Sequence, residues 1–180
     1  MNVELQTLRH VSQKLTDSGI AYMITGSIAL NYYSVPRMTR DIDLVAELEL
    51  GDVSRLVSLF NEDFYIEPNM VREAIQRQSM FNIIHLVGAV KVDFIVRKDS
   101  DYRKTEFSRR RQISITDFTT WITTPEDLIL SKLDWAKDSL SEMQLQDIRN
   151  LLRLEQLDWK YLNHWIGRLN LASVYERVKA

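Results

Sequence analysis

Two aspartates separated by a single residue are the clearest candidates for binding a metal ion. Asp41 and Asp43 lie in a stretch that alternates acidic and apolar residues, 41–45 (DIDLV). In a β-strand, residues two apart project from the same face, so the carboxylates would lie on one side, roughly 6.6–7 Å apart along the backbone. Neighbouring carboxylates repel each other unless a cation lies between them. The pattern therefore indicates a divalent-metal site, although an exposed strand with two surface acids has the same spacing.

A third aspartate lies in a second apolar stretch, 92–96 (VDFIV). Alternation places Val92, Phe94 and Val96 on one face of a strand and leaves Asp93 on the other face, with Lys91. If this strand lies beside that of the first two acids, three carboxylates converge. Such a set suits two metal ions, about 3.5–4 Å apart, that clamp the attacking and leaving oxygens of a phosphoryl transfer. The alternative is a simple ion pair between Asp93 and Lys91 or an arginine.

The composition narrows the kind of metal. The chain has no cysteine, which excludes disulfides, zinc–thiolate sites and a cysteine nucleophile. Its three histidines, His10, His85 and His164, lie far apart in sequence, so a histidine-rich site is not expected. We expect a hard, oxygen-binding ion, Mg²⁺, with two ions bound and Mn²⁺ able to substitute.

A glycine and a serine precede the acidic stretch and could bind phosphate. Gly26-Ser27 follows the apolar run 20–24 and opens a short helical pattern. Glycine lets the backbone approach a phosphate closely, and the N–H groups at a helix N-terminus favour anions. The hydroxyl of Ser27 could donate to a phosphate oxygen. A plain tight turn with a helix cap would have the same sequence.

The elements that would position these groups follow from hydrophobic periodicity. Apolar residues at helical spacing, short apolar runs and turn residues predict the following ranges: helices 3–17, 28–33, 52–60 and 71–78; strands 20–24, 41–46, 64–66, 81–86 and 90–96; a loop at 34–40, a hairpin turn at 87–89 and extended chain at 113–122. The polar stretch 97–111 is rich in arginine and lysine, and its run Arg109–Arg111 could contact RNA phosphates or be a solvated face.

The pattern of apolar residues changes near residue 123, from mixed helices and strands to helices alone, and this change predicts the domain organisation. Thr124-Pro125 followed by two acids is a strong helix start, and the pattern from there to residue 180 is almost wholly helical. We expect an α/β (α+β) fold: a small mixed sheet flanked by helices in residues 1–122, and a C-terminal helical bundle in residues 123–180 that covers the site.

Charge and hydropathy exclude some functions. The formal net charge is -2, which does not indicate a strongly basic nucleic-acid binder. No apolar run approaches the roughly 20 residues of a membrane-spanning helix. The first 19 residues are amphipathic and polar, unlike a signal peptide, so the expected compartment is the cytoplasm.

The stretch 25–45 (TGSIALNYYSVPRMTRDIDLV) resembles the nucleotidyltransferase superfamily, whose best-known member is DNA polymerase beta. The resemblance covers about residues 20–96. It implies that Asp41 and Asp43 bind both metals, and that Asp93 binds one and helps to activate the acceptor hydroxyl. It also implies that Gly26 and Ser27 hold the β- and γ-phosphates.

The helical half is similar to the AbiEii-type branch of that superfamily. Lys132 lies on or beside an apolar helix face, where it should meet an anion such as a triphosphate or extend to solvent. The resemblance implies that Lys132 and Asp147 complete the nucleotide site. Asp147 could orient Lys132, contact the base or be exposed. Arg37 and Arg40 flank the acidic strand and could contact phosphate, the acceptor or only solvent.

The resemblance implies an enzyme that transfers a nucleoside monophosphate (NMP) from an NTP to a hydroxyl and releases pyrophosphate. The acceptor is expected to be RNA or protein, as in a toxin-like element with a cognate antitoxin. The alternatives are a small-molecule adenylyltransferase acting on an antibiotic or metabolite, and a catalytically silent nucleotide-binding module. Exposed apolar helix faces could support a homodimer.

Overall fold

The structure is a computed structural model that describes residues 2–137 and 141–179. Helices and short strands are interspersed up to residue 122, and the elements from residue 125 onwards are helices. In chain order they are α1 (Val3–Asp17), β1 (Tyr22–Ile24), α2 (Gly26–Tyr33), β2 (Ile42–Ala46), the 3₁₀ helix η1 (Leu50–Asp52), α3 (Val53–Phe60), β3 (Phe64–Tyr65), α4 (Pro68–Arg77), β4 (Met80–His85), β5 (Lys91–Val96), α5 (Asp101–Ser108), β6 (Arg111–Ile115), β7 (Phe118–Ile122), α6 (Pro125–Ala136), α7 (Glu142–Leu151), α8 (Trp159–Arg168) and α9 (Ala172–Lys179).

The strands form one mixed sheet, as the sequence predicts. Its order is β3-β4-β5-β2-β1-β7-β6, and it has seven strands within the described residues. The pairs β2–β5 and β1–β7 are parallel, and the other neighbours are antiparallel. Strands β2 and β5 are adjacent although they are far apart in sequence, which brings the two acidic stretches together at the centre of the sheet.

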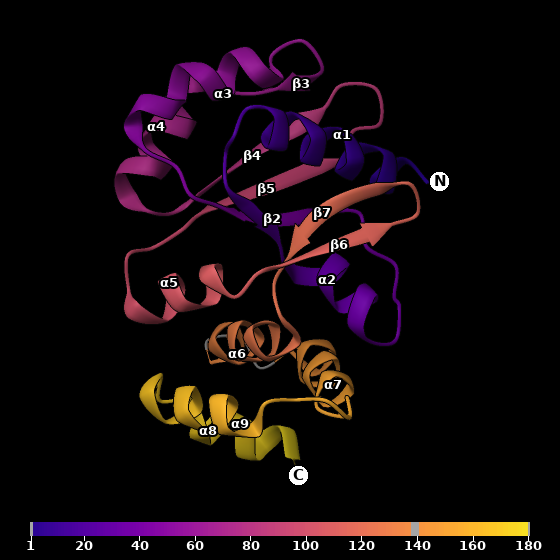
Figure 1. The fold of residues 1–180 in the computed structure, drawn as a ribbon, viewed down its shortest axis with the longest axis vertical. Coiled ribbons are helices and arrows are strands. Elements are labelled where there is room, and N and C mark those ends of the chain that lie inside the picture. Colours follow the sequence, from indigo (N-terminus) through magenta and orange to yellow (C-terminus); the bar gives the residue numbers. More distant parts are fainter. Residues whose placement is uncertain (1, 138–140, 180) are drawn as a thin grey trace.

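The alternation of the central strands sorts their side chains between the two faces of the sheet. Ile42, Leu44 and Phe94 are fully buried in the main core, which continues into α1, α3 and α4. Figure 1 shows these three helices on one side of the sheet, and α2, α5 and the C-terminal helices on the other. The acidic residues of β2 and β5 therefore face the side on which α2 and the helical half lie.

The helical half begins at the predicted cap. The Thr124 hydroxyl accepts a hydrogen bond from the backbone N–H of Asp127, and Pro125 takes the first helical position. The Tyr33 hydroxyl at the end of α2 donates to the Thr123 carbonyl at 2.7 Å, which ties α2 to the start of α6. Buried residues of α6 and α7 join the same hydrophobic core as the sheet. Over the described residues, none of the helices is both long and apolar enough to cross a membrane.

Two local features differ from the sequence-based expectation. The polar stretch 97–111 contains α5, which begins at the Ser100 cap and buries Tyr102 and Phe107. The extended stretch 113–122 belongs to a hairpin of β6 and β7 that turns at Thr116, whose φ is 51°, and Asp117. Neither a helical stripe of apolar residues nor a glycine or proline marks these features in the sequence.

Candidate active site

The central observation is that Asp43 and Asp93 lie side by side in the sheet. They are register partners on the parallel strands β2 and β5, and Asp93 is almost fully buried. Asp41 lies immediately before β2 and is exposed, whereas the sequence pattern places it inside the strand. The structure thus brings the two inner acids together and leaves the third at the solvent edge.

Asp43 lies in a tight contact with the Gly26-Ser27 turn. Gly26 opens α2 with a φ of +61°, and a Cβ on it would come within 2.8 Å of the Cβ of Asp43. The backbone N–H of Ser27 donates to the Asp43 carboxylate. Burial raises the pKa of Asp43, with further contributions from the negative charges of Asp93 and Asp41. The Gly26-Ser27 turn therefore fixes the position of the Asp43 carboxylate, at a place where burial and neighbouring acids disfavour its negative charge.

Lys91 supplies a positive charge to this acidic cluster. Its Nζ lies 2.8 Å from Asp93 Oδ2 and 3.6 Å from Asp41 Oδ2. The hydrogen bond to Asp93 raises the pKa of Lys91, so the side chain is an ammonium ion at neutral pH. The ion pair between Lys91 and Asp93 that the sequence allows is thus present, and Lys91 also pairs with Asp41.

The donor set of this cluster fits a divalent ion. Asp93 Oδ1 is buried and has no hydrogen-bond partner among the described residues, although a buried carboxylate oxygen normally has one. Carboxylate oxygens are the ligands that Mg²⁺ prefers. In residues 2–137 and 141–179, no three acidic or histidine side chains are already arranged around a common metal position. Asp43 and Asp93 therefore fit as a pair of ligands, and Asp41, which shares Lys91 with Asp93, is the third candidate.

A second cluster connects the Gly26-Ser27 turn to the helical half. Arg37 donates to the Ser27 hydroxyl at 2.9 Å and to both carboxylate oxygens of Asp147, at 3.2 and 3.1 Å. Lys132 Nζ donates to Asp147 Oδ2 at 3.0 Å. The side chains of Lys132 and Asp147 are 12% and 5% exposed, so the anion that Lys132 meets in this structure is a buried carboxylate. The predicted residues Ser27, Lys132 and Asp147 are thus brought together.

Comparison with solved structures gives several matches along most of the chain. No family model matches, and no curated protein matches. A nucleotidyltransferase-like protein from Paracoccidioides brasiliensis is 21% identical with a TM-score of 0.56, over 98% of this chain and 93% of that one. The lincosamide antibiotic adenylyltransferase LnuA is 13% identical with a TM-score of 0.58, over 85% and 99% of the two chains. The antibiotic-resistance factor ANT(2")-Ia, solved with adenylyl-2"-tobramycin, is 12% identical with a TM-score of 0.62, over 98% and 99%.

The chain has the nucleotidyltransferase fold. At these identities the likeness is one of fold, and it confirms the fold class that the Gly-Ser turn and the acidic strand predict. Within this fold, the chemistry of the site rests on the positions of its own side chains.

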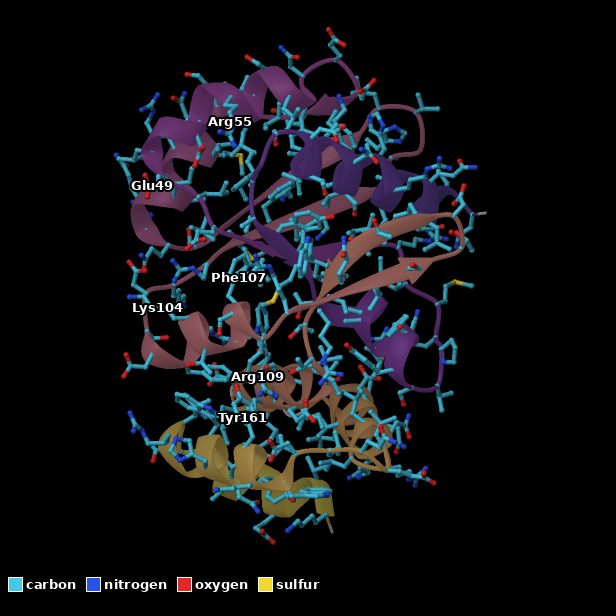
Figure 2. The ribbon with its side chains drawn as sticks, in the orientation of Figure 1. Glu49, Arg55, Lys104, Phe107, Arg109 and Tyr161 are labelled. Carbon is cyan, nitrogen blue, oxygen red and sulfur yellow. The ribbon has the colours of Figure 1, made fainter. Side chains whose placement is uncertain are left out.

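Other arginines of this nucleotidyltransferase fold lie outside the two clusters. Arg40 is exposed and makes no hydrogen bond or ion pair with the described residues. Arg109 lies over the ring of Tyr161, 3.8 Å from its centroid, and its Nε donates to Asp127. Figure 2 shows Arg109 at the end of α5 and Tyr161 on α8 next to each other. Arg110 lies over two aromatic rings. Arg109 and Arg110 are therefore engaged in internal packing.

Sequence reasoning missed how Arg37 is held. The side chain of Asn31, on α2, accepts a hydrogen bond from the Arg37 N–H at 2.9 Å and donates to the Arg37 carbonyl at 2.8 Å. This pair of bonds fixes one residue of the loop 34–40 against α2. An asparagine six residues before a loop arginine carries no recognisable sequence signal, because the contact depends on how the loop folds back.

Replacing Lys91 with methionine is expected to tighten Mn²⁺ binding roughly tenfold, because the metal then no longer competes with the ammonium for Asp93. The metal-free variant should also melt at a lower temperature, since its carboxylates lose their counter-ion. Calorimetric titration with Mn²⁺ measures the first effect, and Lys98→Met, at an exposed lysine beyond β5, is the control. An unchanged Mn²⁺ affinity in Lys91→Met would show that the metal binds elsewhere.

Proposed function

We propose that this protein transfers an NMP from an NTP to a hydroxyl group of an acceptor and releases pyrophosphate. The observation that carries the proposal is the direct pairing of Asp43 with Asp93 beside the Gly26-Ser27 turn. An acidic pair next to backbone N–H groups at a helix N-terminus supplies what phosphoryl transfer requires: metal ligands and an anion site. The nucleotidyltransferase fold supports this assignment.

The chain's own residues would act by positioning and by charge. Asp41, Asp43 and Asp93 would hold Mg²⁺, which when bound neutralises phosphate charge. The free oxygen of Asp93 would accept a hydrogen bond from the attacking acceptor hydroxyl and take its proton as the oxygen attacks. As the new bond between the acceptor oxygen and the α-phosphorus forms, the bond from that phosphorus to pyrophosphate breaks. Ser27 and Lys132 would hold the triphosphate, and most of the rate gain would come from charge stabilisation and alignment.

For the acceptor, we favour a small molecule over RNA. An open surface with free arginines would suit RNA phosphates. Arg109 and Arg110 instead pack on aromatic rings, so that of Arg40, Arg109 and Arg110 only Arg40 is exposed and unpaired among the described residues. Two structures with the same fold, LnuA with lincomycin and ANT(2")-Ia with adenylyl-2"-tobramycin, carry small molecules. A small hydroxyl compound is therefore the acceptor to test first.

We further propose membership of the AbiEii-type branch, a toxin role with a cognate antitoxin, a homodimer and the cytoplasm as the compartment, with RNA or protein as the second class of acceptor to test. The division at residue 122 also remains a prediction, as do two bound Mg²⁺ ions and a nucleotide contact from Arg40. A catalytically silent nucleotide-binding module would have the same fold, and only an assay of the chemistry separates it from an enzyme.

Replacing Asp41 with alanine is expected to weaken NTP binding in Mg²⁺ by roughly tenfold or more, because the metal that bridges protein and phosphates loses a charged ligand. Equilibrium titration with each NTP, in Mg²⁺ and in EDTA, measures this. Asp117→Ala is a matched control: both carboxylates are 54% exposed and pair with a cation, but Asp117 lies at the β6–β7 turn. If Asp41→Ala and wild type bound NTP equally in Mg²⁺, the metal-site assignment would be wrong.

A further inference from the structure

Arg37 is held more firmly than an ordinary loop arginine. Its backbone is anchored by two hydrogen bonds with the Asn31 side chain, which donates to the Arg37 carbonyl and accepts from the Arg37 N–H. Its guanidinium contacts Ser27 and both oxygens of Asp147, and its side chain is 31% exposed. The charged group is therefore fixed in direction, and part of it is open to a ligand.

The charges around Arg37 are not balanced. Within residues 2–137 and 141–179, the Asp147 carboxylate pairs with two cations, Arg37 and Lys132, so this set of three side chains has one positive charge in excess. The Lys132 side chain is only 12% exposed, and a buried charge in excess is unfavourable unless a counter-ion compensates it. The Ser27 hydroxyl accepts the hydrogen bond from Arg37, so its own proton is left to donate. The excess charge and this donor meet at the start of α2, where helix N–H groups also favour an anion.

We propose that Arg37 binds the terminal phosphates of the nucleotide and that Asp147 holds it in place until they arrive. This inference rests on the proposed function, and it names the residue that binds the phosphate end of the NTP substrate. A guanidinium offers a planar fork of donors that matches two phosphate oxygens, which a lysine cannot reproduce. Arg37 and Lys132 together then form a two-cation clamp, with one member from the loop before β2 and the other from α6.

The clamp explains why the hydrogen bonds around Arg37 join residues from both halves of the chain. Arg37 and Ser27 belong to the first half, and Lys132 and Asp147 to the helical half, yet the four side chains form a continuous chain of hydrogen bonds. A bound triphosphate tail replaces part of this contact by bridging the two cations directly. The alternative is that Arg37 only fastens the loop to α7, in which case its loss would not depend on the number of phosphates in a ligand.

The test compares ligands that differ only in their phosphates. The affinities of ATP, AMP and inorganic tripolyphosphate are measured in Mg²⁺ by equilibrium titration for wild type, Arg37→Ala and Arg37→Lys. We expect Arg37→Ala to weaken ATP and tripolyphosphate roughly ten- to hundredfold, with AMP affinity unchanged. Arg37→Lys keeps the charge beside Asp147 and should still lose part of the affinity for both polyphosphates. Arg149→Ala is the matched control, since Arg149 is 28% exposed and pairs with a carboxylate on α7.

The outcomes distinguish a failure of the inference about Arg37 from a failure of the proposed function on which it rests. Equal losses for ATP and AMP, or no loss for tripolyphosphate, would overturn the phosphate-binding role of Arg37 while leaving the proposed function intact. Wild-type protein that bound no NTP of any base in Mg²⁺ would overturn the proposed function, and the inference with it. If Arg37→Ala does not fold, Arg37→Lys decides the matter, because unchanged polyphosphate binding in that variant would contradict the requirement for a guanidinium fork.

Discussion

Replacing Asp43 with asparagine is expected to abolish NMP transfer and, at the same time, to stabilise the metal-free protein. Transfer should fall by at least about 10³-fold, because metal charge stabilisation contributes several kcal/mol and each 1.36 kcal/mol is tenfold in rate. The gain in stability has a separate cause. Burial and the neighbouring acids raise the pKa of Asp43, so its carboxylate form opposes folding.

The sign of the pH dependence follows from that raised pKa. In wild type, the stability contributed by Asp43 is fully present below its ordinary pKa of 3.8 and is lost as pH rises through the higher value in the folded protein. Asparagine carries no charge at any pH. The melting temperature of Asp43→Asn should therefore exceed that of wild type by more at about pH 8 than at about pH 4.

Asp63 provides a control of opposite sign. Hydrogen bonds from His10 and Lys14 lower the pKa of Asp63, so its carboxylate favours folding at neutral pH and this contribution is lost as pH falls. Asp63→Asn should thus melt below wild type near neutral pH and retain NMP transfer. If Asp43→Asn were also less stable than wild type at about pH 8, the electrostatic account of the acidic cluster would be contradicted.

Replacing Gly26 with alanine is expected to remove both metal binding and NMP transfer. The φ of +61° costs an L-residue about 1–2 kcal/mol, which lowers the melting temperature by roughly 2–8 °C in a chain of this size. The larger effect is local. The added Cβ would overlap the Asp43 carboxylate and lie 2.8 Å from its Cβ, so the acid or the turn must move. Thermal melting and Mn²⁺ titration measure the two effects.

Gly167→Ala is the matched control for that substitution. Gly167 lies within α8, and an added Cβ there would meet nothing within 4 Å. Alanine should keep or raise stability, by up to about 0.5–1 kcal/mol, because it restricts the unfolded chain. A Gly26→Ala protein that binds Mn²⁺ as wild type does would show that the turn can yield without displacing Asp43.

The parts of the fold that follow from alternation were predictable. Alternation along β2 and β5 predicts that Ile42 and Phe94 enter the core while Asp43 and Asp93 take the opposite face of their own strands, and Ile42 and Phe94 are fully buried. Asp93 is buried as well, which alternation within one strand does not predict. Helix α5 was not predictable, because only Tyr102 and Phe107 form its apolar contact and charged residues surround them. The turn at Thr116 takes a left-handed conformation without a glycine, so its position also had no sequence signal.

The sequence indicates which residues are candidates for the site, but it does not indicate which of them contact one another. The fold places Asp43 beside Asp93 because β2 and β5 pair in parallel, a register that no local pattern specifies. The contact between Arg37 and Asp147 joins residues 110 apart in the chain and depends on how the helical half packs against α2. Periodicity reports which face a side chain takes within one element, and it carries no information on which distant element covers that face.

The most direct test of the central claim is transfer of label from each α-³²P NTP, in Mg²⁺, to small hydroxyl compounds, cell RNA and cell protein. Wild-type protein and Asp43→Asn are compared under the same conditions. The account predicts labelled acceptor and released pyrophosphate with wild type alone, with a small molecule as the acceptor. Label transferred equally by Asp43→Asn, or no transfer to any acceptor by wild-type protein that binds the NTP, would contradict it.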